Sequence, residues 1–572
     1  MVFRERPRLF HLDMYTLIAG IIILGAIGLR LFFLAIGMPE VNGDEGTMGI
    51  EAMHIAFQGQ HPVFLYGQDY MGVLEAYIAA FFFHLFGVSP FTLRLGMVLM
   101  FLLFMISMYY LTGLLYSKKL ALVTLALLGF GLTSDVMIQQ LRAVGGAIET
   151  LLFGSLVLLL AVWLALTSRP RREQSVRLRL IRLAAYFGWG LSAGLGLWTH
   201  FLVAPFVLAS GLILLVFCMR DLLSFAPLVL ALGFLLGFFP FIIYNIQAQP
   251  GHTTLQAILS IHSSSVPANV QHLLRMRLAG TFLWSLPVAT GLAPVCSLTD
   301  LPYYGPATSS TLPCIVEMGG WSFGYMFLMT VAALLAILGL WKLWMARRTR
   351  ETSWTQEERA AIIINFSRLM ILFAVALTLF FYISSPLSAL KPWSTRYLVG
   401  LLVGVPAVLW PLWTAAGFEK FILPSRSRLL ALVNRAILVI VSVAILAGTA
   451  ASFSAIPSVE ADNQQQQALV QGLLSIGATR VYSGYWTGGY RLVFQSQERI
   501  ISAVPSGLSE PGTNRYQHYV PIVNADPNAA YVFIVNSPDA LSFAQKITHS
   551  HIKYRRYIFG IYVVYQPVNA QH

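Results

Sequence analysis

The sequence has few charged residues for a chain of its length. Of its 572 residues, only 11% are Asp, Glu, Lys or Arg, whereas 57% are apolar. A soluble domain carries about a quarter charged residues, so this composition excludes an ordinary soluble protein. The apolar residues come in long runs, and roughly 20 such residues cross the hydrocarbon core of a bilayer. The sequence therefore predicts an integral membrane protein.

Motifs for nucleotides, nucleic acids and metals are also lacking. There is no P-loop and no GxGxxG motif after a strand. The net charge of +13 lies in short Lys/Arg clusters between apolar runs, which is typical of a topology signal and not of a nucleic-acid partner. His252, His262 and His272 have no tight ligand spacing, so no metal site is predicted. No cofactor is required, and a divalent metal is left open.

Cysteine is scarce, with three residues in the chain. Cys218 lies in an apolar run and is expected to serve packing. Cys296 and Cys314 share one long loop, and two cysteines in a non-cytoplasmic loop can form a disulfide. The sequence alone leaves open whether they meet.

The first apolar run, residues 15–37, is longer than the core of a signal peptide and has no cleavage site after it. Arg4, Arg6 and Arg8 precede it, which predicts a cytoplasmic N-terminus. Eleven spans follow from this start, and every strong Lys/Arg cluster then falls on the cytoplasmic side. The predicted spans are residues 15–37, 91–115, 120–134, 147–166, 183–199, 201–219, 224–246, 321–343, 369–385, 397–415 and 436–454.

Residues 73–87 are apolar but short, and we expect them to form a helix in the outer interface. If they formed a full span, Lys118 and Lys119 would fall on the wrong side. This topology predicts a multi-pass protein of the plasma membrane with a transmembrane domain over residues 1–455. Its predicted outer loops are residues 38–90, 135–146, 247–320 and 385–396.

The composition changes after about residue 455. Residues 456–572 are polar and contain no run long enough to span a membrane. A helical stretch at 462–476 is followed by strand-like stretches, which predicts a small soluble α/β domain on the outer face. The strand-like stretches are residues 480–486, 498–504, 530–535 and 557–566.

Two adjacent acids, Asp44 and Glu45, lie a few residues beyond the first span. Residues 48–57, which follow them, have helical apolar spacing. Polar groups near the membrane are costly and often functional, but Asp is also a common helix cap. Capping explains one acid and not two, and the residue types alone leave both interpretations open.

Further polar residues are expected on the outer side. Glu149 follows Arg142 at the outer start of a span, where an acid is also favoured by the helix dipole. Lys391 and Arg396 lie in a short outer loop, against the usual charge bias. Such cations pair well with phosphate oxygens, although a single one more often reaches for lipid headgroups. His200 lies at the outer tip of a hairpin, where a lone histidine is more often structural.

One more cation, Arg30, lies within the first span near its outer end. We expect it either to pair with an acid or to touch a lipid phosphate.

Taken together, these segments resemble the GT-C class of polyprenyl-phosphate-dependent glycosyltransferases, which includes protein O-mannosyltransferases and lipid A aminoarabinose transferases. One departure is residues 69–72, where relatives commonly have a proline pair on the acceptor side. The resemblance rests on the Asp44-Glu45 pair, GTMGIEAMHIAFQGQHP, YGQDYMGVLEAYIAAFFFHLFGVSPFTLRL, LRAVGGAIETLLFG, GLGLWTH, GFFPFIIYN, STRYL and SGYWTGGYRLVFQSQERI.

The resemblance implies an inverting transfer from a polyprenyl-phosphate sugar to a hydroxyl of a glycan, lipid or protein acceptor. Asp44 would take the proton of that hydroxyl, and cations would stabilise the leaving phosphate. The implied cations are Arg396, Lys391 and Arg142, and the implied substrate-binding residues are Glu45, Glu149 and His200.

Two other functions are consistent with a multi-span protein of this kind. A transporter or flippase for lipid-linked glycans is disfavoured because paired repeats with broken helices are absent from the sequence. A non-catalytic scaffold that presents the C-terminal domain predicts that Asp44→Asn has no effect.

Overall fold

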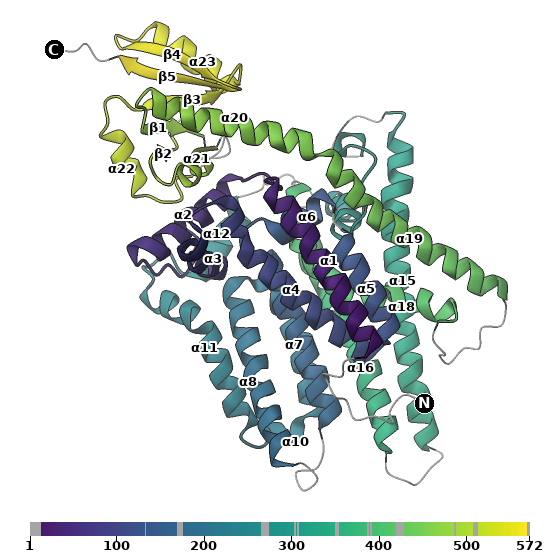
Figure 1. Cartoon of the computed structure of the whole chain (residues 1–572). Helices are drawn as coiled ribbons and strands as arrows, with labels where there is room; N and C mark the ends of the chain where they lie inside the picture. Colours follow the sequence, from purple (N-terminus) through teal and green to yellow (C-terminus); the bar gives the residue numbers. More distant parts are fainter. Residues whose placement is uncertain are drawn as a thin grey trace.

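The computed structural model describes residues 13–131, 133–168, 175–264, 274–301, 305, 308–348, 354–385, 388, 392–418, 428–484, 488–506 and 513–568. Over these residues the protein is a bundle of long helices with a small α/β domain packed at one end of it (Figure 1).

The bundle is that of a polytopic membrane protein. In the described part of the chain, nine helices are long and apolar enough to cross a membrane. Helices α5 (Lys118–Phe130) and α6 (Ser134–Leu141) meet at 91°, and together they form a tenth crossing if they are counted as one broken span. The shorter apolar helix α9 (Ala204–Phe217) corresponds to the remaining predicted span. The nine are α1 (Met14–Ala35), α4 (Pro90–Leu115), α7 (Ala147–Thr167), α8 (Val176–Thr199), α11 (Ala226–Gln247), α15 (Thr311–Arg348), α16 (Gln356–Ser384), Ser394–Ala415 and Arg428–Ser475.

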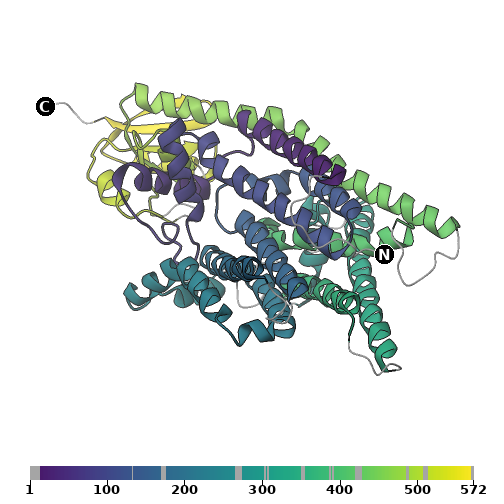
Figure 2. The ribbon, with the colours of Figure 1, turned by 60° about the horizontal axis from the view of Figure 1, so that its bottom comes forward.

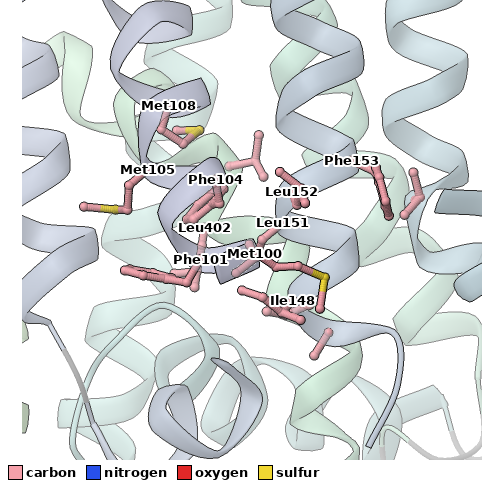
Figure 3. Packing of buried hydrophobic residues seen from close by; sticks show 14 of the residues in the cluster. Met100, Phe101, Phe104, Met105, Met108, Ile148, Leu151, Leu152, Phe153 and Leu402 are labelled. Carbon is pink, nitrogen blue, oxygen red and sulfur yellow. The ribbon is translucent and has the colours of Figure 1, made fainter. Parts of the chain in front are cut away.

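Helix α7 lies deep in the bundle, since 78% of its most apolar stretch is buried, whereas only 17% of that of α11 is buried. Figure 3 shows the packing between α4 and α7, in which Phe101 and Phe104 meet Leu151, and Leu402 joins them from a third segment. Side chains of this size account for most of the area removed from the surroundings on packing.

Helices α8 and α11 approach each other closely through glycines. A Cβ atom on Gly190 would lie 2.1 Å from the carbonyl oxygen of Leu230, and one on Gly233 would lie 2.3 Å from that of Phe187. Glycines spaced four apart are the usual device for close packing of membrane helices, and Gly194 and Gly237 supply the second position on each helix.

Arg30 is fully buried, and its hydrogen bonds over the described residues go to carbonyl and amide oxygens, not to the acid that was one of the two expected partners. Its buried guanidinium donates to the carbonyl oxygens of Ala26, Leu128 and Gly129 and to Oε1 of Gln140, at 2.5–3.3 Å. The carbonyls at the end of α5 have no partner within their own helix, so the cation satisfies them at the break between α5 and α6.

Two predicted outer loops are partly helical. Residues 135–146 contain most of α6, and residues 247–320 contain several short helices. These helices lack the long apolar runs that identify spans, so hydropathy does not reveal them. The short helices in the second loop are α12 (Thr254–Ser264), α13 (Leu274–Gly280), η3 (Thr281–Ser285), α14 (Leu286–Ala289) and η4 (Leu298–Asp300).

The question left open for the cysteines has an answer in the structure. Cys296 and Cys314 are joined by a disulfide, with their Cα atoms 5.9 Å apart. Cys218 is a buried free thiol. The disulfide ties the loop before α15 to the first turns of that helix.

The expected interfacial helix is present as α3 (Leu74–Phe86), which is too short to count as a span. The last helix of the membrane domain, α19 (Arg428–Ser454), runs beside the first, α1 (Figure 2). The rings of Phe33 and Phe453 lie 5.0 Å apart. Helix α20 (Ile456–Ser475) continues from α19 and leads into the C-terminal domain (Figure 1).

The C-terminal domain contains a five-stranded sheet of order β2-β1-β3-β5-β4. Strand β1 pairs in parallel with β2 and β3, and the β3–β5 and β4–β5 pairs are antiparallel. The stretch predicted as one strand at 557–566 is two strands, because the chain reverses at Gly560, whose φ is +59°. The strands are β1 (Arg480–Ser483), β2 (Ile501–Ala503), β3 (Ala530–Ile534), β4 (Lys553–Phe559) and β5 (Tyr562–Val568), and the helices after α20 are α21 (Tyr490–Gln495), α22 (Tyr519–Asn524) and α23 (Pro538–Thr548).

The C-terminal domain docks on α2 (Gly43–Gln58) through α21. A Cβ atom on Gly46 would lie 2.6 Å from the backbone nitrogen of Arg491, and one on Gly49 would lie 2.5 Å from the ring of Phe494. The two backbones therefore approach as closely as glycine allows, and this contact places the domain over the N-terminal end of α2.

Candidate functional site

The site begins at the first turn of α2, which starts earlier than the helix predicted at 48–57. Asn42 is the N-cap, since its side chain accepts a hydrogen bond from the backbone N–H of Glu45 at 2.9 Å. Asp44 is therefore not the cap of this helix. Both acids lie in the first turn, where the helix dipole favours negative charge.

Asp44 lies between two guanidinium groups from distant parts of the chain. Its side chain is nearly buried, with the residue 6% exposed. Arg515, from the C-terminal domain, lies 3.2 Å from Oδ1, and Arg396 lies 3.9 Å from Oδ2. Arg396 is at the start of η5 (Pro392–Gly404). Three elements thus meet at one carboxylate, and the two predicted residues Asp44 and Arg396 are brought together.

Two tyrosines, Tyr397 and Tyr70, lie beside Arg396 and His200 in this site. Arg396 donates to the hydroxyl of Tyr397 at 3.3 Å, and the ring centroid of Tyr397 lies 6.1 Å from that of His200. Tyr70 packs edge-on against His200 at 6.4 Å. Burial, together with the neighbouring Tyr397, raises the pKa of Tyr70 above its usual value, so its hydroxyl keeps its proton and can donate.

His200 has a structural role that the sequence already suggested, and it also lies beside Arg396. Its Nδ1 accepts a hydrogen bond from the backbone N–H of Leu202 at 3.2 Å, so the proton of the neutral ring lies on Nε2. Burial, with a contribution from Arg396, lowers the pKa of His200 to about 4. Gly146 makes room for the ring, since a Cβ there would lie 2.5 Å from it.

Glu45 occupies a different environment from the one predicted. It forms a bidentate ion pair with Arg94 of α4, at 2.7 and 2.6 Å, and both residues are buried. Its Oε1 also accepts from the backbone N–H of Ala143 at 3.0 Å. Because both carboxylate oxygens are engaged inside the protein, Glu45 fixes α2 against α4. Its predicted role in binding sugar or acceptor stays a prediction.

Glu149 is also enclosed by the protein. It is fully buried in the first turn of α7, beside Glu75 of α3. Glu75 accepts from the backbone N–H of Gly145 at 3.0 Å. Burial raises the pKa of Glu75 well above its usual range, and the adjacent Glu149 adds to the shift. The predicted role of Glu149 in binding sugar or acceptor stays a prediction.

The remaining predicted cations have different positions. Arg142 donates to the carbonyl oxygen of Glu40 at 2.7 Å and so holds the segment that precedes α2. Lys391 lies outside the described residues. Over the described part of the chain, there is no group of three or more His, Cys, Asp or Glu side chains that could hold a metal ion.

Sequence reasoning missed two important residues. Arg94 is a charge inside an apolar span, and such a residue usually faces a partner in the bundle, so this signal was available. Arg515 gave no signal, because it is 471 residues from Asp44 in a polar domain and only the docking of that domain brings it to the site.

No protein-family model and no curated protein matches this sequence. Several solved structures align with nearly the whole chain, among them the following two. ArnT from Cupriavidus metallidurans bound to undecaprenyl phosphate is 14% identical, with 96% of this chain and 97% of that chain covered and a TM-score of 0.47. The archaeal oligosaccharyltransferase AglB from Archaeoglobus fulgidus, in complex with an inhibitory peptide and a dolichol-phosphate, is 13% identical, with 97% and 74% covered and a TM-score of 0.47.

Proposed function

We propose that this protein transfers a glycosyl group from a polyprenyl-phosphate-linked sugar to an acceptor hydroxyl at the outer face of the membrane, with inversion. The observation that carries the proposal is the position of Asp44. It lies where the membrane domain meets the C-terminal domain, with the guanidinium groups of Arg396 and Arg515 beside it.

Asp44, Arg396 and Arg515 form a charge cluster that suits an anionic donor. One carboxylate and two guanidinium groups leave a positive balance in a largely buried place, where charge interactions are stronger than in water. Arginine binds phosphate oxygens through two parallel hydrogen bonds. A phosphate that enters the cluster brings the missing negative charge, and its lipid chain remains in the membrane.

The reaction requires a base and a stabilised leaving group. Asp44 takes the proton of the acceptor hydroxyl while the hydroxyl oxygen forms a bond to the anomeric carbon. The bond between that carbon and the phosphate oxygen breaks, and the electron pair leaves with the polyprenyl phosphate. Arg396 stabilises the charge that develops on the phosphate. Because the leaving group is a phosphate, no strong general acid is needed.

The other predicted residues have supporting parts in this proposal. Glu45 and its partner Arg94 fix the first turn of α2, so that Asp44 is held in place. His200, through the ring of Tyr397, helps to place Arg396. Lys391 is proposed as a further cation near the leaving phosphate.

The test is a transfer assay with the purified full chain in lipid nanodiscs. With a polyprenyl-phosphate hexose and a panel of glycan, lipid and peptide acceptors, the wild type should release polyprenyl phosphate. Asp44→Asn should slow release by roughly two orders of magnitude, the scale of a lost general base. Asp526→Asn is a matched control, because the Asp526 carboxylate accepts from the backbone N–H of Asn528 within the C-terminal domain.

The alternative functions give different results. Full activity in Asp44→Asn would remove Asp44 as the base. A flippase would move the lipid-linked sugar across the bilayer with its glycosyl bond intact, so no polyprenyl phosphate would be released with any acceptor.

A further inference from the structure

We propose that Arg515, supplied by the C-terminal domain, gives up its ion pair with Asp44 and pairs with the phosphate of the donor instead when the donor binds. Arg515 holds Asp44 in an ion pair, and when the donor binds its guanidinium moves to the phosphate and releases Oδ1. The inference rests on the proposed function, and it assigns to the C-terminal domain a direct part in recognising the donor's charge.

The position of Arg515 differs from that of a surface ion pair. Its side chain is only 13% exposed and lies between the first turn of α2 and the turn at residues 66–70. NH2 contacts Asp44 at 3.2 Å and NH1 donates to the carbonyl oxygen of Gly67 at 3.2 Å. With the amide of Gln68 turned so that its oxygen faces the guanidinium, NH1 and NH2 donate to it at 2.7 and 2.5 Å. Asp44 is the charged partner among these contacts, and the other two are neutral.

The backbone that carries Arg515 is fixed to the end of strand β2. The side chain of Asn514 accepts from the N–H of Val504 at 2.8 Å and donates to its carbonyl oxygen at 3.1 Å. On the other side, the N–H of Tyr516 donates to the hydroxyl of Tyr490 at 2.8 Å. Arg515 therefore extends from a rigid anchor, and its guanidinium can move while its backbone stays in place.

The sheet topology gives an independent reason to expect a ligand here. Strand β2 runs parallel to β1, and β1 runs parallel to β3. In open sheets with parallel strands, ligands bind outside the carboxyl ends of the strands. The bond from Asn514 to Val504 places Arg515 just beyond the carboxyl end of β2, and Arg515 reaches Asp44 from there.

The docking of the domain also holds this segment. The ring of Tyr516 packs against His54 and Tyr66, with centroids 4.9 and 4.6 Å apart. His54 Nε2 in turn lies 2.9 Å from Oε1 of Glu498. The contact of Tyr516 with His54 therefore joins the segment that carries Arg515 to α2, and the docked domain sets the distance from Arg515 to Asp44.

The exchange follows from the needs of the base. Arg515 lies on Oδ1 of Asp44 and Arg396 lies on Oδ2, so each carboxylate oxygen faces a cation. A carboxylate oxygen that takes a proton must first have room for the acceptor hydroxyl. A phosphate offers a guanidinium two oxygens and a full charge, which makes it a suitable replacement partner for Arg515.

The test compares binding of polyprenyl phosphate with binding of the uncharged polyprenol of equal chain length, using the full chain in nanodiscs. The wild type should prefer the phosphate. Arg515→Ala should weaken phosphate binding by about 10- to 100-fold, the value of one charge-assisted contact, and leave polyprenol binding unchanged. Arg515→Lys should recover part of the loss. Arg499→Ala is the matched control, because Arg499 donates within its own domain, to the carbonyl oxygen of Ser496.

Asp44→Asn distinguishes exchange from a fixed phosphate contact. Removal of the competing carboxylate should tighten polyprenyl phosphate binding several-fold, and Arg515→Ala in the same chain should abolish that gain. Unchanged phosphate binding in Asp44→Asn would overturn the exchange. In the transfer assay, Arg515→Ala should raise KM for the donor more than it lowers kcat.

Other outcomes separate this inference from the proposed function. If Arg515→Ala binds the phosphate as the wild type does, the inference is wrong and the proposed function stands. If Arg515→Ala loses phosphate and polyprenol binding alike, as Gly49→Ala is expected to do by loosening the domain, Arg515 serves docking and the inference is overturned. If the wild type does not prefer the phosphate, the proposed function fails and the inference fails with it.

Discussion

Gly46 determines how closely α2 and the C-terminal domain can pack, and Gly46→Ala tests this contact. A Cβ at this position would lie 2.6 Å from the nitrogen of Arg491 and 2.6 Å from the carbonyl carbon of Tyr490. Carbon atoms in contact are roughly 3.5–4.0 Å apart, and backbone atoms cannot rotate away. The two elements must therefore separate by roughly 1 Å.

The expected cost follows from two opposing effects. Overpacking typically costs about 1–3 kcal/mol, whereas alanine is favoured over glycine in a helix by up to about 1 kcal/mol. The net loss is then up to about 2 kcal/mol, and it falls on the contact that brings Arg515 to Asp44. Transfer activity should drop together with the stability of the docked domain.

The assay is amide hydrogen exchange of the full chain in nanodiscs, read on α21. Gly46→Ala should speed exchange there while the apolar spans keep their protection. Gly20→Ala is the matched control, because a Cβ on Gly20 of α1 would meet nothing within 4 Å. If Gly46→Ala protects α21 as well as the wild type does, the close approach of the two backbones is not what holds the domain.

Two further predictions concern the Glu45–Arg94 ion pair and the titration of His200. Glu45→Ala leaves the guanidinium of Arg94 buried without its partner, which should destabilise the protein by about 3–5 kcal/mol; the drop in thermal midpoint should be smaller in a double variant that also removes Arg94. His200 has a folded-state pKa of about 4 against an ordinary 6.5, so the unfolded chain binds more protons between these pH values and stability should fall as the pH drops through this window. His200→Asn, which can still accept from Leu202, should show a smaller fall, by up to about 3 kcal/mol, in thermal unfolding measured from pH 7 to 4.

The spans could be predicted from the sequence because the information is local. An apolar run such as residues 91–115 identifies a helix by length alone, and α4 was found at almost these bounds. The short helices α6 and α14 could not be predicted in this way. Leu286, at the start of α14, is fully buried, but it belongs to an apolar stretch too short for a span, and its burial depends on neighbours from distant parts of the chain.

The site was predictable to a smaller extent. Asp44 and Arg396 were expected on one face, and the structure brings them together. Adjacent positions in a helix point about 100° apart, so Asp44 and Glu45 face different surroundings, and residue type alone cannot tell which acid is paired inside the protein. Arg515 depends on the docking of a whole domain, which no local pattern encodes.

The contacts of Arg30 have a consequence for biogenesis. Its partners on Leu128, Gly129 and Gln140 follow it by 98–110 residues, and at about 5–20 residues per second the ribosome makes them roughly 5–20 s later. During that interval α1 is in the membrane with a charge whose insertion costs about 2.5–3.5 kcal/mol. The strongly apolar remainder of α1 carries this cost until α5 and α6 arrive. A substitution such as Gln140→Ala, which removes the side-chain acceptor among these partners, would therefore act first on assembly in the membrane.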